Sequence, residues 1–279
     1  MYSSALINSL HQELQRNFPR GKLLLGGSYF YGEADDQSDL DFYYLSSVTA
    51  LFLAKKIKQR VQSIRQKFPG VRFSLMLVPD WLFRRGWYFI DGKDLAKERY
   101  TSPLRPDVII RNSLKFALWY LLNSKIASAP ALIIGDLRKA AHQLAAALLV
   151  LGRLNTRAPF AQAEQARLLA QALPAGDYRL LQVLRRQELA ADSIPEYQAR
   201  LQAVILKTEK PAENYWRLAW RNYLLYNLWF GRRGLALFLT TNPDKLVRER
   251  LVAACSLAKP ALEQELAVLK QIIFPVIIF

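Results

Sequence analysis

The stretch LLLGGSYFYGEADDQSDLDFYYL, residues 23–45, decides the fold of the first part of the chain. One short apolar run ends in Gly26, Gly27 and Ser28, and a second begins at Asp39. Both have the length and composition of strands. Glycines at the end of a strand let backbone amides approach a phosphate with no Cβ in the way, and the serine hydroxyl adds a donor. This turn is therefore a candidate anion site.

The second strand carries two acidic residues close together. The two-residue period of a strand puts Asp39 and Asp41 on one face, with Leu40 and Phe42 on the other. Like charges on one face repel unless something binds there, and carboxylate oxygens are ligands that Mg²⁺ prefers. The alternative is a Gly-rich turn followed by an exposed strand with solvated aspartates. It leaves the apolar residues around those charges unexplained.

Outward from this stretch, the pattern predicts further helices and strands up to about residue 105. Apolar residues at helical spacing indicate helices over 3–18 and 51–68, each stopped by a Pro/Gly pair. Apolar and aromatic runs indicate strands over 71–78 and 87–90, and Asp91-Gly92 after the second has the composition of a hairpin turn.

The sequence pattern changes after about residue 105, where Ala/Leu-rich segments with a helical period of 3.6 residues replace the strand-like runs. Several expected helices have proline in the first turn, where its missing N–H costs little. The starts lie near Pro106, Pro130, Pro159, Asp177, Ile194, Pro211, Leu235, Pro243 and Pro260. We therefore predict an α+β protein with a small mixed-sheet head, residues 1–105, and an all-helical domain, residues 106–279.

Composition excludes several classes. The chain has 279 residues, a net charge of +16, one cysteine and two histidines. An internal disulfide and a four-ligand zinc site are excluded. With no leader-like start and no long apolar segment, a cytoplasmic protein without a transmembrane segment is expected. The positive charge favours anionic partners, although a solubilising basic surface would explain it equally well.

The motif of residues 23–45 resembles the DNA polymerase β-like nucleotidyltransferases. That superfamily combines an apolar strand, Gly-Gly-Ser, a connection of about ten residues, and Asp-x-Asp within a second apolar strand. Gly26, Gly27 and Ser28, then Asp39 and Asp41, occupy those positions here. The resemblance covers about residues 20–90, and Gly32 fits the frequent Gly-Ser-x-x-x-Gly form.

This resemblance implies a mechanism. Ser28 and the backbone near Gly27 would hold the phosphates of a nucleoside triphosphate, and Asp39 and Asp41 would hold two Mg²⁺ ions. An acceptor oxygen would attack the α-phosphorus and release pyrophosphate. Because the chain is basic, an anionic acceptor is expected, such as RNA, an acidic glycan or a metabolite, and the helical domain would help to form the acceptor side. Cationic aminoglycosides are disfavoured.

The chain departs from the family at a third carboxylate, which active members usually carry on a later strand. Residues 71–79 contain no acid, and serine or methionine takes that place. Asp80 and Asp91 are substitutes, although a helix-start or loop role for Asp80 and a turn role for Asp91 are favoured. The rival function is therefore a catalytically inactive member that binds nucleotide or RNA or scaffolds a partner.

Other conspicuous residues have simpler explanations. The acidic loop of Glu33, Asp35 and Asp36 is expected to be solvated, and Arg84 and Arg85 to be exposed beside packed aromatics. The aromatic segment 215–233 is expected to be a core helix rather than an acceptor groove. His11 and His142 are expected to pack, and Cys255 to be a small buried hydrophobe.

The apolar end of the chain, residues 272–279, is too short to cross a bilayer. Three placements are open. It can dock on the protein itself, on a protein partner, or on a membrane surface.

Overall fold

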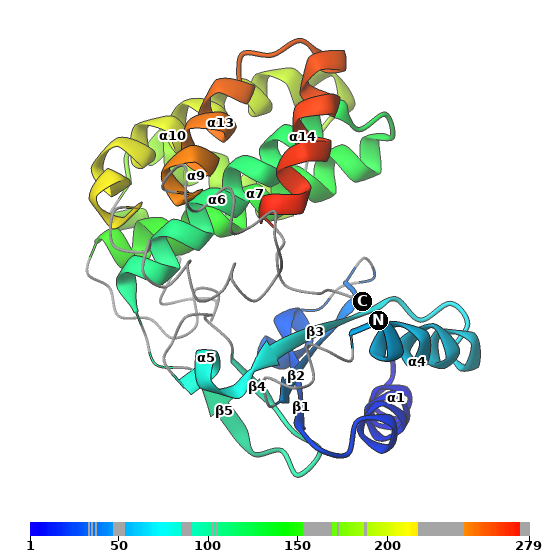
Figure 1. The fold of residues 1–279 in the computed structure, drawn as a ribbon. Coiled ribbons are helices and arrows are strands. Elements are labelled where there is room, and N and C mark those ends of the chain that lie inside the picture. Colours follow the sequence, from blue (N-terminus) through cyan, green and yellow to red (C-terminus); the bar gives the residue numbers. More distant parts are fainter. Residues whose placement is uncertain are drawn as a thin grey trace. The chain divides into compact units, whose positions relative to one another are not determined.

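The computed structural model describes most of the chain. The described residues are 1–32, 34, 36, 38–46, 54–84, 91–101, 103, 105–152, 169–171, 173–186, 189–216 and 243–273. They divide into two compact units, one ending at Arg105 and the other beginning at Pro106 (Figure 1).

The first unit combines helices with a five-stranded mixed sheet. Its strands lie in the order β3-β2-β1-β4-β5, and only β2 and β3 are parallel. The elements are α1 (Ser4–Asn17), β1 (Lys22–Gly26), α2 (Gly27–Tyr31), β2 (Leu40–Ser46), α4 (Ala54–Lys67), β3 (Phe73–Pro79), α5 (Asp80–Arg84), β4 (Asp91–Lys93) and β5 (Arg99–Thr101). The predicted α+β class is confirmed.

Helices α1 and α4 cover one face of this sheet. The ring of Phe42 on β2 lies against His11 of α1, with 5.4 Å between centroids, and Tyr44 contacts Phe18 at the same distance. The apolar face of α4, including Ile57 and Val61, is buried. Alternation along β2 therefore turns its odd-numbered residues, Asp41 among them, to the opposite face.

The opposite face of the sheet has its own small apolar core, which includes residues near the carboxyl ends of β2 and β3. Leu24, Leu45, Val78 and Phe83 form it, and Tyr43, Met76 and Tyr100 pack against it. A slip of one residue in β2 would exchange its two faces and turn Asp41 toward the buried layer of α1 and α4, which fixes the register of this strand.

The prediction of a hairpin turn at Asp91-Gly92 is wrong. Both residues belong to β4, where Gly92 pairs with Tyr100. The chain turns later, where the Asp94 carboxylate accepts a hydrogen bond from the Glu98 amide at 3.0 Å. A Cβ on Gly92 would lie 2.9 Å from the Leu25 carbonyl oxygen, so glycine serves the close approach of two strands rather than a turn.

The regular structure described in the second unit is all helical. Helix α6 packs against α7, α10, α13 and α14, and its leucines and alanines lie at the centre of the core. The helices are α6 (Pro106–Ile126), α7 (Pro130–Leu151), α9 (Ala175–Arg186), the 3₁₀ turn η1 (Ala191–Ser193), α10 (Ile194–Trp216), α13 (Pro243–Ala254) and α14 (Lys259–Ile273). The lone thiol, Cys255, is buried as predicted.

The prediction of a helix start at Pro211 is wrong, because α10 continues through that residue. Five further predictions fall wholly or largely outside the described residues: the strand over 87–90, the helix from Pro159, the helix from Leu235, the aromatic segment and the apolar end. No helix in the described part of the chain is long and apolar enough to span a bilayer.

Candidate functional site

The end of β1 brings Gly27 against the carboxylate of Asp41. Gly26 pairs with Asp41 across β1 and β2, and Gly27 then takes a φ of +62°, a left-handed conformation that L side chains rarely adopt. A Cβ built on Gly27 would lie 2.3 Å from Asp41 Oδ2. Only glycine leaves room for the carboxylate here.

Ser74 holds the other oxygen of the same carboxylate. The parallel register of β2 and β3 sets Asp41 opposite Ser74, and the Ser74 hydroxyl donates to Asp41 Oδ1 at 2.9 Å. Serine is therefore the β3 residue that lies next to Asp41, and the described part of β3 places no acid there. The Asp41 carboxylate therefore lies between the backbone of Gly27 and the hydroxyl of Ser74.

Helix α2 begins directly at this turn and carries Ser28 in its first turn. Gly26 caps the helix without a side-chain bond, and Gly32 ends it in a left-handed conformation, where its N–H donates to the Ser28 carbonyl. The three glycines of the motif thus serve a strand end, a close approach and a helix end. Ser28 and Asp39 are both half-buried.

Tyr2 ties α2 to the start of β3. The Tyr2 amide donates to the Tyr29 hydroxyl at 2.9 Å, and the two rings stack. The Tyr2 hydroxyl in turn accepts from the Arg72 amide at 2.9 Å, and Leu40 N donates to Arg72 O at 3.0 Å. These contacts join α2 and the first residues of β2 and β3, the elements that carry Ser28, Asp41 and Ser74. Sequence patterns gave no signal for the role of Tyr2.

Asp80 does not join Asp41 as a third acid within the described part of the chain. Asp80 begins α5 and pairs with Arg84 at 2.6 Å, in agreement with its helix-start role. Asp91 lies on β4, which β1 separates from β2, and its side chain lies outside the described residues. No group of three or more His, Cys, Asp or Glu residues in the described part is arranged to hold a metal ion.

The remaining candidates behave as packing or surface residues. His11 is buried, its Nε2 lies 3.0 Å from the Leu23 carbonyl oxygen, and burial lowers its pKa. Asp36 is highly exposed and pairs with the amino terminus at 2.6 Å. Glu33, Asp35 and Arg85 lie outside the described residues.

Two carboxylates beside a glycine-rich turn are too few ligands for a metal ion that is held entirely by protein, but they suit Mg²⁺. Mg²⁺ keeps several waters and binds through one or two carboxylates together with substrate phosphates. Asp41 is fixed, and Asp39 precedes the same strand by one residue. The chemistry of these donors therefore fits Mg²⁺ that takes its remaining ligands from water or a bound phosphate.

No protein-family model, curated protein or solved structure matches this chain.

Proposed function

We propose that the chain is a Mg²⁺-dependent nucleotidyltransferase, with a nucleotidyltransferase-like head over residues 1–105 and a helical domain after it. It would move a nucleotidyl group from a nucleoside triphosphate to an anionic acceptor such as RNA, an acidic glycan or a metabolite. Asp39 and Asp41 would hold the metal, and Gly26, Gly27 and Ser28 would hold the phosphates.

One observation carries this proposal: the Asp41 carboxylate lies against the backbone of Gly27, at the start of the turn that contains Ser28. A solvated surface aspartate would need neither a glycine beneath it nor a hydroxyl beside it. The turn and Asp41 are thirteen or more residues apart in sequence, yet the sheet register brings them together.

The residues would divide the work between binding and orientation. Backbone amides at the β1–α2 turn and the Ser28 hydroxyl would donate to phosphate oxygens. Bound Mg²⁺ would stabilise negative charge on the attacking and leaving oxygens. The Ser74 hydroxyl would keep Asp41 Oδ1 oriented, leaving Oδ2 at the turn, so that the carboxylate meets an incoming ion without reorganising.

Pyrophosphate release tests the proposal. The full chain is incubated with each of the four labelled nucleoside triphosphates, Mg²⁺ and pools of RNA or acidic small molecules. Release that falls at least about tenfold in Asp41→Asn, but not in Asp80→Asn, supports transfer at this site. Asn keeps an acceptor for the Ser74 hydroxyl, so the variant should still fold. Release that Asp41→Asn leaves unchanged contradicts the proposal.

The second candidate is a member of the same fold that binds Mg–nucleotide without transferring it. Ser74 favours this candidate, because a serine beside Asp41 supplies no carboxylate to take a proton from the acceptor. Binding of nucleotide without pyrophosphate release in every acceptor pool would select it.

Ser74→Asp distinguishes metal binding from a purely structural contact. Without divalent ions, a second acid beside Asp41 creates repulsion between like charges and should lower the melting temperature. Added Mg²⁺ should restore it, because an ion bound only by the folded state stabilises that state. Thermal unfolding with EDTA and with Mg²⁺ measures this, and Ser74→Asn is the uncharged control. A loss in Ser74→Asp that Mg²⁺ does not reduce would contradict metal binding at Asp41.

A further inference from the structure

The net charge of the first unit is concentrated in two helices. Helices α1 and α4 together carry seven basic residues and one acidic residue, a net charge of +6, whereas the rest of residues 1–105 carries nine of each sign. Six of the seven lie on α4, which has no acidic residue: Lys55, Lys56, Lys58, Arg60, Arg65 and Lys67.

This distribution is unfavourable for an isolated helix. Lys55 and Lys56 lie in the first turn of α4, at the positive end of the helix dipole, and Lys56 and Arg60 are like charges four residues apart. A solvated surface helix usually mixes both signs. An anionic partner would offset both unfavourable terms.

Most of this charge is not neutralised by any residue that the structure describes in the unit. Arg60 donates to the carbonyl of Asn17 at 2.8 Å and Arg65 to the carbonyl of Phe73 at 3.2 Å, and a carbonyl accepts without cancelling the charge. Lys56 and Lys58 are exposed, with no hydrogen bond or ion pair to any described residue.

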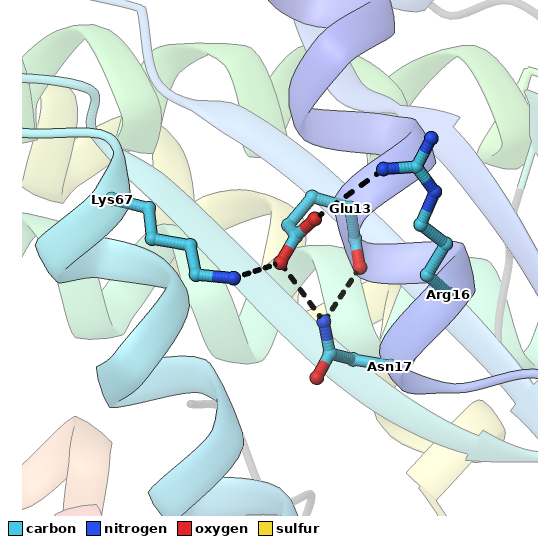
Figure 2. A network of polar contacts seen from close by, with 4 residues as sticks. All are labelled: Glu13, Arg16, Asn17 and Lys67. Atoms are coloured by element: carbon cyan, nitrogen blue, oxygen red, sulfur yellow. Dashed lines mark hydrogen bonds and ion pairs between the residues drawn. The ribbon is translucent and has the colours of Figure 1, made fainter.

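Glu13 is the one acid of this layer, and its carboxylate is already occupied. It accepts from Lys67 at 2.5 Å and Asn17 at 3.3 Å, and lies 3.9 Å from Arg16 (Figure 2). The hydrogen bond from Lys67, more than any other contact, lowers its pKa. The carboxylate therefore offsets only one of the seven cations.

We propose that the exposed side of α4 binds the phosphate backbone of a nucleic acid. Every described exposed side chain on α4 is a lysine, arginine, glutamine or serine, and each can donate a hydrogen bond to a phosphate oxygen. Lys56, Arg60 and Lys67 form a row along the α1 side of the helix, about 16 Å long at 1.5 Å per residue.

The same residues disfavour a membrane as the partner. A helix that lies in a membrane interface exposes an apolar face to the lipid. Here the apolar face, with Ile57, Val61 and Ile64, is buried within the unit. The surface also lies on the sheet face opposite Asp41, so a bound strand would not cover the proposed nucleotide site.

Binding to short strands tests this surface in the full chain. Fluorescence anisotropy with labelled 20-nucleotide RNA and DNA, without nucleotide or Mg²⁺, should give a Kd of about 10⁻⁶ M at low salt. Lys56→Glu/Lys58→Glu should raise Kd about tenfold or more and reduce the slope of log K against log salt by about 1.4. The matched control, Lys259→Glu/Lys270→Glu on α14, makes the same charge change at two exposed residues and should have a much smaller effect.

Glu13→Gln removes the one negative charge and should lower Kd about two- to threefold, a gain that misfolding would not produce. Asp41→Asn should leave Kd unchanged, which separates this surface from the nucleotide site. Three results would overturn the proposal: no binding to either strand, equal losses in the two double variants, or binding only to vesicles containing phosphatidylserine.

Discussion

Gly27 and Gly32, the residues at the two ends of α2, adopt left-handed backbone under different constraints. Their φ angles are +62° and +74°. A Cβ on Gly27 would meet Asp41 Oδ2 at 2.3 Å, whereas one on Gly32 would have nothing within 4 Å. The backbone alone restricts Gly32, but both the backbone and the carboxylate restrict Gly27.

Replacing each glycine by alanine separates these constraints. Gly32→Ala should lower the free energy of unfolding by about 1–2 kcal/mol, the cost of left-handed backbone for an L residue. Gly27→Ala should lower it by about 2–4 kcal/mol, because the methyl group must also displace the Asp41 carboxylate. Urea denaturation measures both. Equal losses would show that Asp41 does not depend on the space at Gly27.

His11 makes the stability of the first unit depend on pH. Burial lowers its pKa below the ordinary value of 6.5, against the smaller raising effects of its Leu23 hydrogen bond and of Asp94. Because the unfolded chain binds the proton more readily, this contribution is fully present above pH 6.5 and is lost as the pH falls through the lowered folded pKa.

The free energy of unfolding should therefore decrease as the pH falls below 6.5, and His11→Gln should flatten that part of the curve. Glu13→Gln is the control. The lowered pKa of Glu13 removes stability only below its ordinary value of 4.5, so this variant should keep the His11 slope. Denaturant titrations between pH 4 and 8 measure both. The histidine interpretation would be wrong if His11→Gln kept the full slope.

At the scale of elements, Pro211 shows where pattern alone fails. Proline is common in the first turn of a helix, which is why the sequence predicted a start there. In α10 it lies in the interior, between Lys210 and the buried Ala212. Periodicity cannot separate a start from an interior proline, because both continue the same apolar stripe.

Pro211→Ala should raise the free energy of unfolding by about 1–2 kcal/mol. Alanine restores the backbone N–H and relieves the clash with the preceding turn, and part of this gain is offset by the greater freedom of the unfolded chain. The residue is exposed, so no core packing is lost. Thermal or urea unfolding measures the change. A loss of stability would indicate that the helix begins at Pro211 after all.

The strands of the first unit differ in how far their own residues predict them. β1, β2 and β3 were predicted because each is a mainly apolar run of five to seven residues, and β1 and β3 end at glycine and proline. β4 has only the three residues Asp91–Lys93, and its pairing with β1 overrides the turn preference of Asp-Gly. Short strands depend on tertiary contacts, which the local sequence does not contain.

The same limit applies to the candidate site. The motif alone singled out Gly27 and Asp41 together, but not the close approach between them. The parallel register of β2 and β3 sets Ser74, rather than Met76, opposite Asp41, and the local sequence does not contain this pairing. Tyr2 lies outside every recognisable motif, and only its bonds to Tyr29 and Arg72 reveal its role.

At the scale of the whole chain, the first unit places its basic helices and the candidate site on opposite faces of one sheet. The basic helices α1 and α4 cover one face of the sheet, whereas Asp41 and Ser74 belong to the other. The net charge of +16 therefore does not describe the surroundings of Asp41. A basic surface can attract an anionic partner by long-range steering. In the proposed function, the acids on the other face would remain available to a metal–nucleotide complex.

Calorimetric titration of the full chain with non-hydrolysable nucleoside triphosphate analogues tests the proposed site most directly. Binding should require Mg²⁺, and Asp39→Asn and Asp41→Asn should each raise Kd at least about tenfold, equivalent to ~1.4 kcal/mol. Asp80→Asn, which alters an acid paired with Arg84, should leave Kd unchanged. Binding that persists in EDTA or in Asp41→Asn, or no binding of any of the four analogues, would contradict a metal–nucleotide site at Asp41.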